Sequence, residues 1–412
     1  MLAACWNTTT SISSDGQKLS YTTGKDKSNL FVNKSLNTGE STDLTVNVVT
    51  GVPKRQDRFG YQNINSGKVY NLSFCFPYLS DYRNGKWNYH PYYDAGENRN
   101  SAVSNFHVSF FAPKSYKVAA SGQSTTKNGK TTITANNMRE VAIAASNKFK
   151  VDHAYANGVR INDYYLASKN SKLALMTAQD SFHVFTKKIG KYPYKEIDIT
   201  EGLLGKDTGG MEYPGLIMID ASGFLQKKHP LDRYNELTED VSHEVGHQWF
   251  YGTVGSDEYM EPWLDEGLTN LLENGVYDLT YTKSKAYCAK LMHSKFYTRK
   301  NVKRANKILK ENANQFINKN KKANYINYPV NNPPKGVDTE DMAYELGMDF
   351  PAVLKVAMGE NKFFDALHDY YQTYYLKQAT TQDFLNIIRK YDNSKKVNNV
   401  INKFIDPKYL SE

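Results

Sequence analysis

The sequence lacks long apolar runs, has few cysteines and contains no extended low-complexity segment. No stretch approaches the roughly 18 apolar residues that a membrane-spanning helix needs, which excludes a span of that kind. Three cysteines in 412 residues are too few for a disulfide framework, although Cys75 and Cys288 leave room for one bridge. The hydrophobic share of 40% and the charged share of 23% are typical of globular proteins, and the length predicts two or three domains.

The first residues carry a short motif that resembles a bacterial lipobox, in which a cysteine is acylated after signal cleavage. The motif reads Leu2-Ala3-Ala4-Cys5. It predicts a lipid anchor at Cys5, with residues 1–15 as an anchor or flexible terminus that tethers the protein to the outer face of a bacterial membrane. The charged and apolar regions of a signal peptide are missing, so either this chain starts late or the match is accidental, with a cytoplasmic location as the alternative.

The formal net charge of +9 is concentrated in residues 283–322, where Glu311 is the single acid. We expect a basic surface helix or loop there. A basic segment alone does not identify a nucleic-acid partner, and no recognised nucleic-acid-binding module accompanies it, so we predict none. The sequence does not indicate an oligomeric state.

Apolar residues alternate with polar ones in several stretches between residues 40 and 151, with glycine, asparagine and proline between the stretches. The clearest examples are Leu44/Val46/Val48, Leu72/Phe74/Phe76 and Val108/Phe110. A period of two predicts half-buried strands. We therefore expect an antiparallel β domain over residues 16–165.

The pattern changes after residue 172. Apolar positions at helical spacing run from Leu175 to Ile189, short strands are expected at 197–200 and 215–220, and helices dominate beyond residue 236. The strongest of those later helices are expected at Asp341–Met358 and Thr381–Tyr391. Residues 166–412 are thus predicted to form a second, mostly helical domain, which makes the whole chain an α+β multidomain protein.

The segment VSHEVGHQWF contains the strongest chemical signal. In a helix, residues four apart lie on one face, so His243 and His247 can direct two imidazoles at one metal ion. Glu244 then lies beside the ion without binding it. This spacing is typical of zinc hydrolases.

The third ligand is expected on a returning helix. Gln248, Trp249 and Phe250 should continue the first helix, Gly252 and Gly255 should break it, and Pro262 suits the first turn of the next one. That helix presents Glu266. Two imidazoles and a carboxylate leave a fourth zinc position for water, as in catalytic sites, whereas a structural site is closed, usually by cysteines.

This ligand set predicts one zinc ion per chain and hydrolysis of peptide bonds. The zinc would polarise a carbonyl and acidify its bound water, while Glu244 accepts a proton and passes it to the leaving amine. In the alternative interpretation, His243 and His247 are core histidines on a buried helix and Glu266 is a surface acid.

The pattern His-Glu-x-x-His, followed after eighteen residues by Glu266 in a Trp-Leu-x-Glu-Gly frame, resembles the aminopeptidase N family of gluzincin zinc metallopeptidases, in clan MA. The segment Gly209-Gly210-Met211-Glu212 resembles the Gly-x-Met-Glu-Asn motif of that family. The resemblance implies that residues 209–212 lie on an edge strand that binds the substrate backbone, and that Glu212 binds its free amino group.

Two further residues take their roles from the same resemblance. Tyr344, in Met342-Ala-Tyr-Glu-Leu-Gly347, matches the tyrosine that donates a hydrogen bond to the oxyanion of the tetrahedral intermediate. Glu273, seven residues after Glu266, matches an acid that orients a zinc histidine. Without the resemblance, packing is the default role for one of 31 tyrosines, and Glu273 would be an exposed helix acid.

The resemblance also implies a saddle-like N-terminal β domain and a thermolysin-like catalytic domain. The family segment Ala-Arg-x-x-Phe-Pro-Cys-x-Asp-Glu-Pro is missing from the first domain, and so is any counterpart of the large C-terminal helical domain, which predicts a bacterial short form with a more open cleft. Tyr213 replaces the asparagine of the amine-binding motif. An aminopeptidase is therefore the leading hypothesis. A thermolysin-type endopeptidase, or a surface protein that binds peptides without cleaving them, is the alternative.

Overall fold

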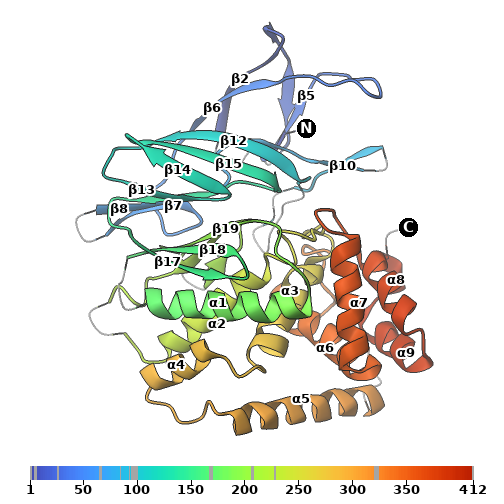
Figure 1. The fold of residues 1–412 in the computed structure, drawn as a ribbon. Coiled ribbons are helices and arrows are strands. Elements are labelled where there is room, and N and C mark those ends of the chain that lie inside the picture. Colours follow the sequence, from blue (N-terminus) through green and yellow to red (C-terminus); the bar gives the residue numbers. More distant parts are fainter. Residues whose placement is uncertain are drawn as a thin grey trace.

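The structure is a computed structural model of the chain. It describes residues 2–3, 7–25, 27–64, 67–83, 85–91, 93, 101–166, 170–205, 208–226, 229–319 and 324–410. Strands occupy the first part and helices most of the rest (Figure 1). Cys5, at which a lipid anchor was predicted, lies outside the described residues.

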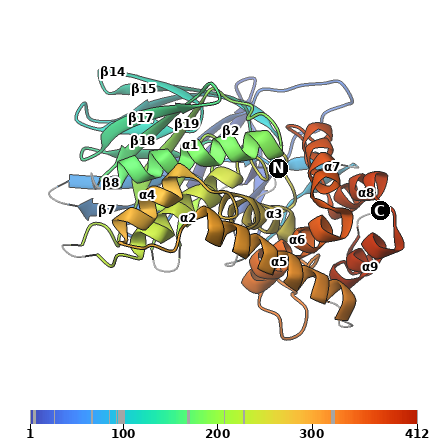
Figure 2. The ribbon, with the colours of Figure 1, turned by 60° about the horizontal axis from the view of Figure 1, so that its bottom comes forward.

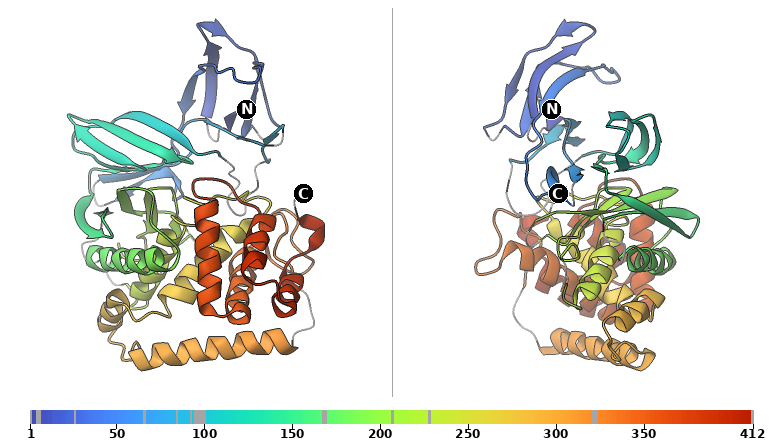
Figure 3. Two further views of the ribbon diagram at one scale, coloured as in Figure 1. Left: turned by 45° about the vertical axis from the view of Figure 1, so that its right-hand side comes forward. Right: turned by 90° about the vertical axis from the view of Figure 1, so that its left-hand side faces the viewer.

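The described residues of the N-terminal part form five small antiparallel sheets. Figure 3 shows its first strands projecting away from the helices. Two sheets lie at the N-terminal end, in the orders β3-β2-β6 and β4-β5-β1-β9, and β10 pairs with β11. Their strands are β1 (Leu2–Ala3), β2 (Asn7–Ser14), β3 (Gln17–Lys18), β4 (Tyr21–Thr23), β5 (Asn29–Val32), β6 (Thr45–Thr50), β9 (Tyr78–Leu79), β10 (Asp81–Arg83) and β11 (Lys86–Asn88).

Two further sheets connect this part to the helical one. One has the order β12-β15-β14 and the other β13-β16-β8-β7. Their strands are β7 (Phe59–Ile64), β8 (Gly67–Leu72), β12 (Ser104–Phe111), β13 (Lys117–Ala120), β14 (Gln123–Lys127), β15 (Lys130–Met138) and β16 (Ile143–Ser146). The predicted antiparallel β architecture is confirmed.

One predicted strand is wrong. The alternation Leu72/Phe74/Phe76 suggested a strand through Phe76, but β8 ends at Leu72. Phe74 adopts a φ of +55°, which interrupts an extended backbone. The apolar alternation continued beyond the strand because Phe74 packs beside the buried Tyr213 ring, with 6.3 Å between the ring centroids.

The sheet that carries the site has the strand order β17-β18-β19-β21-β20. Its strands are β17 (Lys150–Ala156), β18 (Val159–Tyr165), β19 (Glu196–Gly202), β20 (Gly210–Met211) and β21 (Leu216–Asp220). β18, β19 and β21 are parallel neighbours, and β20 pairs antiparallel with β21 at the edge. This hydrogen-bonded sheet extends across the boundary that the sequence predicted at residues 165/166, because the hairpin β17–β18 pairs with β19.

Helices cover one side of this sheet and form the rest of the chain. Figure 2 shows α1 and α2 side by side next to the strands, and α5 crossing close to α6. The α-helices are α1 (Ser171–Lys188), α2 (Arg233–Gly246), α3 (Glu266–Leu272), α4 (Lys283–Leu291), α5 (Arg299–Lys319), α6 (Leu346–Met358), α7 (Glu360–Thr373), α8 (Thr381–Tyr391) and α9 (Lys395–Phe404). Short helices occur at η1 (Pro262–Leu264), η2 (Glu273–Tyr277), η3 (Asp341–Glu345) and η4 (Pro407–Tyr409).

The predicted helices are largely confirmed, and the basic segment 283–322 contains α4 and α5. The helix with the histidine pair ends earlier than expected. α2 stops at Gly246 with His247 as its C-cap, and the chain then turns so that the rings of Phe182 and Phe185 meet the Trp249 ring edge-on. The Trp249 indole nitrogen donates to the Gly190 carbonyl at 2.8 Å. Burial of this large ring therefore ends the helix before residue 250.

The β region is attached to the helical part through the buried Arg139 side chain. Its guanidinium donates to the carbonyls of Tyr251 at 2.8 Å and Lys377 at 2.5 Å, and also to that of Ser101 at 3.2 Å. Tyr251 follows α2 and Lys377 precedes α8. Since a buried guanidinium is stable only when its donors are satisfied, this contact fixes the β region against the segment after α2.

No helix among the described residues is long and apolar enough to cross a membrane. Cys75 and Cys288 are free thiols, so the bridge that the sequence left open does not form. Location at a membrane surface stays a prediction.

We predict that Arg139→Met lowers the free energy of unfolding by about 3–5 kcal/mol, because it leaves buried carbonyls without their donor. Denaturant unfolding followed by tryptophan fluorescence measures the change. Arg304→Met, on the exposed face of α5, is the matched control and should change stability by less than about 0.5 kcal/mol. Equal effects of the two substitutions would contradict the role of Arg139.

Candidate metal centre

The helix α2 places two imidazoles side by side. Its apolar residues Leu237, Val241 and Val245 are buried, which fixes the rotation of the helix. His243 and His247 lie one turn apart on the neighbouring face, with 3.0 Å between their Nε2 atoms. The early end of α2 does not disturb this pair, because His247 keeps helical backbone angles as the C-cap.

The third group comes from the first residue of α3. Glu266 Oε2 lies 3.3 Å from His243 Nε2 and 3.2 Å from His247 Nε2. Zinc bonds of 2.0–2.1 Å in a tetrahedron require ligand atoms about 3.3 Å apart. The three observed spacings are therefore close to three edges of such a tetrahedron, and the donor set fits zinc.

Carboxylates on the far side of both rings fix their orientation. His247 Nδ1 lies 2.5 Å from Asp265 Oδ1, and His243 Nδ1 lies 3.2 Å from Glu273 Oε2. If each Nδ1 carries the proton that these acids accept, both Nε2 lone pairs point at one another and at the Glu266 oxygen. Such an arrangement of acceptors fits a metal cation between them.

The role of Asp265 was not recognised from the sequence. Glu273, in contrast, lies in the structure where the family resemblance implied. Asp265 directly precedes Glu266, but sequence spacing alone does not show that neighbouring carboxylates point to opposite sides of one imidazole. The 3-10 helix Pro262–Leu264 leads into α3 and orients both. The Thr269 hydroxyl also approaches His247 Nδ1, at 3.1 Å.

Electrostatics keep Glu266 ionised. Burial opposes its ionisation, but the imidazoles of His247 and His243 hold the pKa of Glu266 well below its usual range. Burial also raises the pKa of the Glu244 carboxyl, and the same imidazoles act in the opposite direction. Glu244 thus lies beside the three ligands in a site that excludes most water.

The edge strand β20 lies directly against Glu244. A Cβ atom built on Gly210 would lie 2.3 Å from Glu244 Oε1, so this carboxylate occupies space that any other residue at position 210 would fill. Met211 and Glu212 follow, and Glu212 is 4% exposed. Residues 209–212, predicted to lie on an edge strand, include β20 at the edge of the sheet.

The side chain of Gln248 connects this segment to the end of α2. Its Nε2 donates to the carbonyls of Glu212 at 3.2 Å and Tyr213 at 3.3 Å, and its Oε1 accepts from the Gly215 amide at 2.9 Å. The sequence prediction assigned Gln248 only to a continuing helix. It is instead a positioning residue that ties the segment 212–215 to the metal-binding helix.

Tyr344 approaches the ligands from η3. Its hydroxyl lies 2.5 Å from Glu266 Oε1, and its ring lies over that of His243 with 6.1 Å between centroids. The contact depends on close packing of α3 and α6: a Cβ on Gly267 would lie 2.5 Å from the Gly347 carbonyl carbon. Both glycines therefore bring Glu266 and Tyr344 together.

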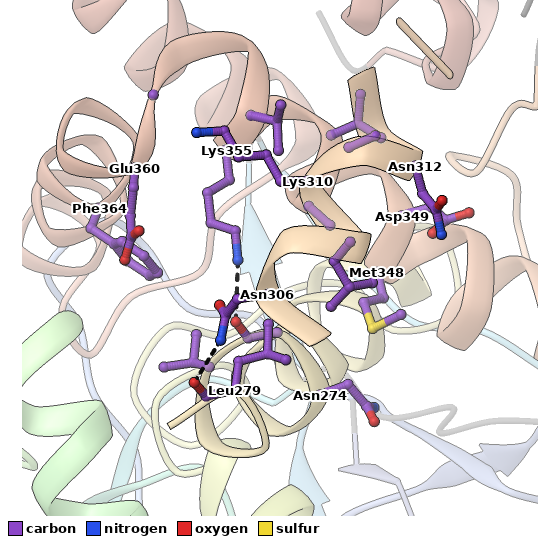
Figure 4. A pocket seen from close by; sticks show the side chains of 18 of the residues that line it. Asn274, Leu279, Asn306, Lys310, Asn312, Met348, Asp349, Lys355, Glu360 and Phe364 are labelled. Atoms are coloured by element: carbon purple, nitrogen blue, oxygen red, sulfur yellow. Dashed lines mark hydrogen bonds between the residues drawn. The ribbon is translucent and has the colours of Figure 1, made fainter. Parts of the chain in front are cut away.

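Two cavities lie near these elements. One, of about 450 Å³, lies between α5, η2 and α6, and Figure 4 shows Met348, Leu279 and Lys355 around it. It adjoins Asn274, next to Glu273, but none of the three candidate ligands lines it. The other, of about 570 Å³, is lined by Gly209 and Asp240 and adjoins β20.

One point is thus surrounded by the candidate ligands, the predicted base and the predicted oxyanion donor. β20 lies beside them. The interpretation of His243 and His247 as ordinary core histidines does not explain why their Nε2 atoms face a carboxylate oxygen and each other.

Comparison with solved structures finds the same fold. The chain superimposes on the M1 zinc metallopeptidase of Deinococcus radiodurans with a TM-score of 0.60 and 16% identity, over 98% of this chain and 85% of that one. Aminopeptidase A of Legionella pneumophila gives a TM-score of 0.66 at 14% identity, over 98% of this chain and 45% of that one. The predicted combination of an N-terminal β region and a helical peptidase part is confirmed.

Comparison by sequence finds aminopeptidases. Aminopeptidase Q of Felis catus is 25% identical over 198 residues, which are 47% of this chain and 18% of the relative. Endoplasmic reticulum aminopeptidase 1 of Mus musculus is 24% identical over 258 residues, 60% of this chain and 25% of the relative. The aligned regions thus span a quarter or less of these relatives.

The model of the peptidase family M1 domain matches residues 173–404, more than half of the chain, and this range contains every candidate site residue. The resemblance inferred from the motifs is confirmed: the chain belongs to peptidase family M1.

Proposed function

We propose that the protein is a zinc-dependent peptidase that removes N-terminal residues from peptides. The observation that carries the proposal is the set of spacings among His243 Nε2, His247 Nε2 and Glu266 Oε2, 3.0 to 3.3 Å, with Glu244 beside them. Membership of family M1 supports it. Bound zinc would supply a polarised carbonyl and an acidified water.

The side chains around the metal centre have complementary roles. Glu244 accepts the proton of the attacking water and passes it to the leaving amine. The Tyr344 hydroxyl, which donates to Glu266 Oε1 in this structure, donates instead to the oxygen that becomes negative as the peptide carbonyl is attacked. Asp265 and Glu273 hold the imidazoles in the required tautomer.

The direction of cleavage follows from the segment 209–212. A peptide that pairs with the free edge of β20 has its backbone beside Gly210 and its amino group near Glu212, and a carboxylate is a suitable partner for an ammonium group. The two sequence relatives described above are named as aminopeptidases. A mutant of the Deinococcus radiodurans metallopeptidase has been crystallised with the substrate Tyr-Ser-Ala.

A thermolysin-type endopeptidase is the second candidate. The observation that favours it is Tyr213, which stands where the amine-binding motif has asparagine, and which is fully buried. Such an enzyme would use the same metal chemistry without amine recognition.

We predict that Glu244→Gln abolishes peptide hydrolysis while zinc binding persists, because the substitution removes the base and no ligand atom. Zinc content by atomic absorption and release of amine from a free tripeptide give the two readouts. Glu239→Gln, on the same helix, serves as the control and should keep at least about half of the activity. Normal turnover by Glu244→Gln would refute the assignment of the base.

Tyr344→Phe should retain zinc and lower kcat by about a hundredfold or more, because one oxyanion donor is lost. Tyr391→Phe, at the end of α8 and away from the site, also removes a tyrosine hydroxyl and should keep kcat within about twofold of the wild-type value. Steady-state kinetics with one tripeptide measures both. Near-normal turnover by Tyr344→Phe would assign this residue to packing.

A panel of tripeptides with free and N-acetylated termini separates the two candidate functions. Loss of an ion pair with a charged amine costs about 1.5–3 kcal/mol, so we expect free peptides to react at least about tenfold faster in kcat/KM. Equal rates for the free and blocked forms would favour the endopeptidase.

A further inference from the structure

The segment 209–213 runs beside α2. Three side chains of α2 and its C-terminal extension, four residues apart in sequence, contact this segment in chain order. Asp240 lies against Gly209, where a Cβ atom would be 2.5 Å from Asp240 Oδ1, and Glu244 lies against Gly210. Gln248 donates to the carbonyls of Glu212 and Tyr213. The strand and the helix therefore run in the same direction beside each other.

These contacts order the positions along a bound peptide. If the peptide amine is near Glu212 and the base Glu244 is beside Gly210, the residue after the scissile bond extends toward Gly209. Asp240 is the side chain that lies there. Asp240 therefore lies on the side of the leaving group. This placement follows from the order of the contacts along the segment and does not depend on which ligand is bound.

A cavity of about 570 Å³ opens at this end of the segment. Its volume accommodates a long side chain. The charged residues of its lining are Asp220, Arg233, Glu236 and Asp240. Three of these are acids and one is a base, so the described lining favours a cationic group.

Two of the three acids already have partners. Asp220 accepts from the amides of Leu204 at 3.0 Å and Ser222 at 3.1 Å. Glu236 forms an ion pair with Arg233 at 2.5 Å. Asp240 has no hydrogen-bond or ion-pair partner in the part of the chain that the structure describes, although it is only partly exposed.

The ionised form of an acid of this kind is unfavourable unless a cation joins it. Burial, together with the nearby Glu244 carboxylate, raises the pKa of the Asp240 carboxyl to about 8. A cationic side chain in the cavity would stabilise the ionised form of Asp240.

We propose that Asp240 and this cavity form the subsite for the side chain that follows the scissile bond, and that they select lysine or arginine at that position. The inference rests on the proposed peptidase function. It adds a substrate class, peptides with a basic second residue, and a specificity-determining residue.

The test compares Ala-Lys-Ala, Ala-norleucine-Ala and Ala-Glu-Ala as substrates of the zinc-loaded protein. Lysine and norleucine have side chains of similar length, and only lysine is charged. We expect kcat/KM for the lysine peptide to exceed that for the norleucine peptide by about tenfold, and the glutamate peptide to be cleaved most slowly. The ratio of rates is the readout because a change at Asp240 also affects Glu244, and that effect cancels between substrates.

Asp240→Asn should reduce the lysine-to-norleucine ratio to about one, and Asp240→Lys should make the glutamate peptide the preferred substrate. Asp365→Asn, at an exposed position of α7, removes the same charge from outside the cavity and should keep the wild-type ratio. Circular dichroism and zinc content check that each variant folds.

Each outcome has a separate meaning. No cleavage of any peptide by the folded, zinc-loaded wild-type protein would refute the proposed peptidase function. Cleavage of all three peptides with a lysine-to-norleucine ratio near one, or an unchanged ratio in Asp240→Asn, would refute the role of Asp240 and leave the peptidase function intact.

Discussion

The site depends on one electrostatic constraint: three acceptor atoms from two segments converge at 3.0 to 3.3 Å from one another. Two imidazole lone pairs and a carboxylate oxygen repel each other at these distances unless a cation lies between them. The surrounding structure serves to maintain this arrangement. Asp265 and Glu273 orient the rings, and the contact between Gly267 and Gly347 brings the Tyr344 hydroxyl to Glu266.

Much of the site was predictable from local spacing. The i, i+4 spacing of His243 and His247 needs only a helix, and a helix was readily predicted because its apolar residues recur at helical spacing. Glu266 required a family motif, since eighteen intervening residues allow many chain paths. Asp265 and Gln248 were not predicted, because their contacts depend on which element packs against α2, and this packing is a tertiary property.

The fold was predicted at the level of elements and less well at their ends. Helix α8 has the predicted bounds, Thr381–Tyr391, because a capping box begins it and its apolar face is continuous. The strand expected through Phe76 ends at Leu72. Apolar alternation in the sequence does not reveal the positive φ of Phe74, which interrupts the extended backbone. The hairpin β17–β18 was assigned to the first domain because alternation does not reveal which sheet a strand joins.

Zinc held by two imidazole nitrogens and a carboxylate oxygen should be visible by X-ray absorption at the zinc edge of the zinc-loaded protein. We expect a four-coordinate ion with nitrogen and oxygen neighbours at about 2.0–2.1 Å, two of them imidazoles, and loss of one imidazole in His247→Ala. Sulfur neighbours at about 2.3 Å, or a zinc spectrum that His247→Ala leaves unchanged, would contradict it.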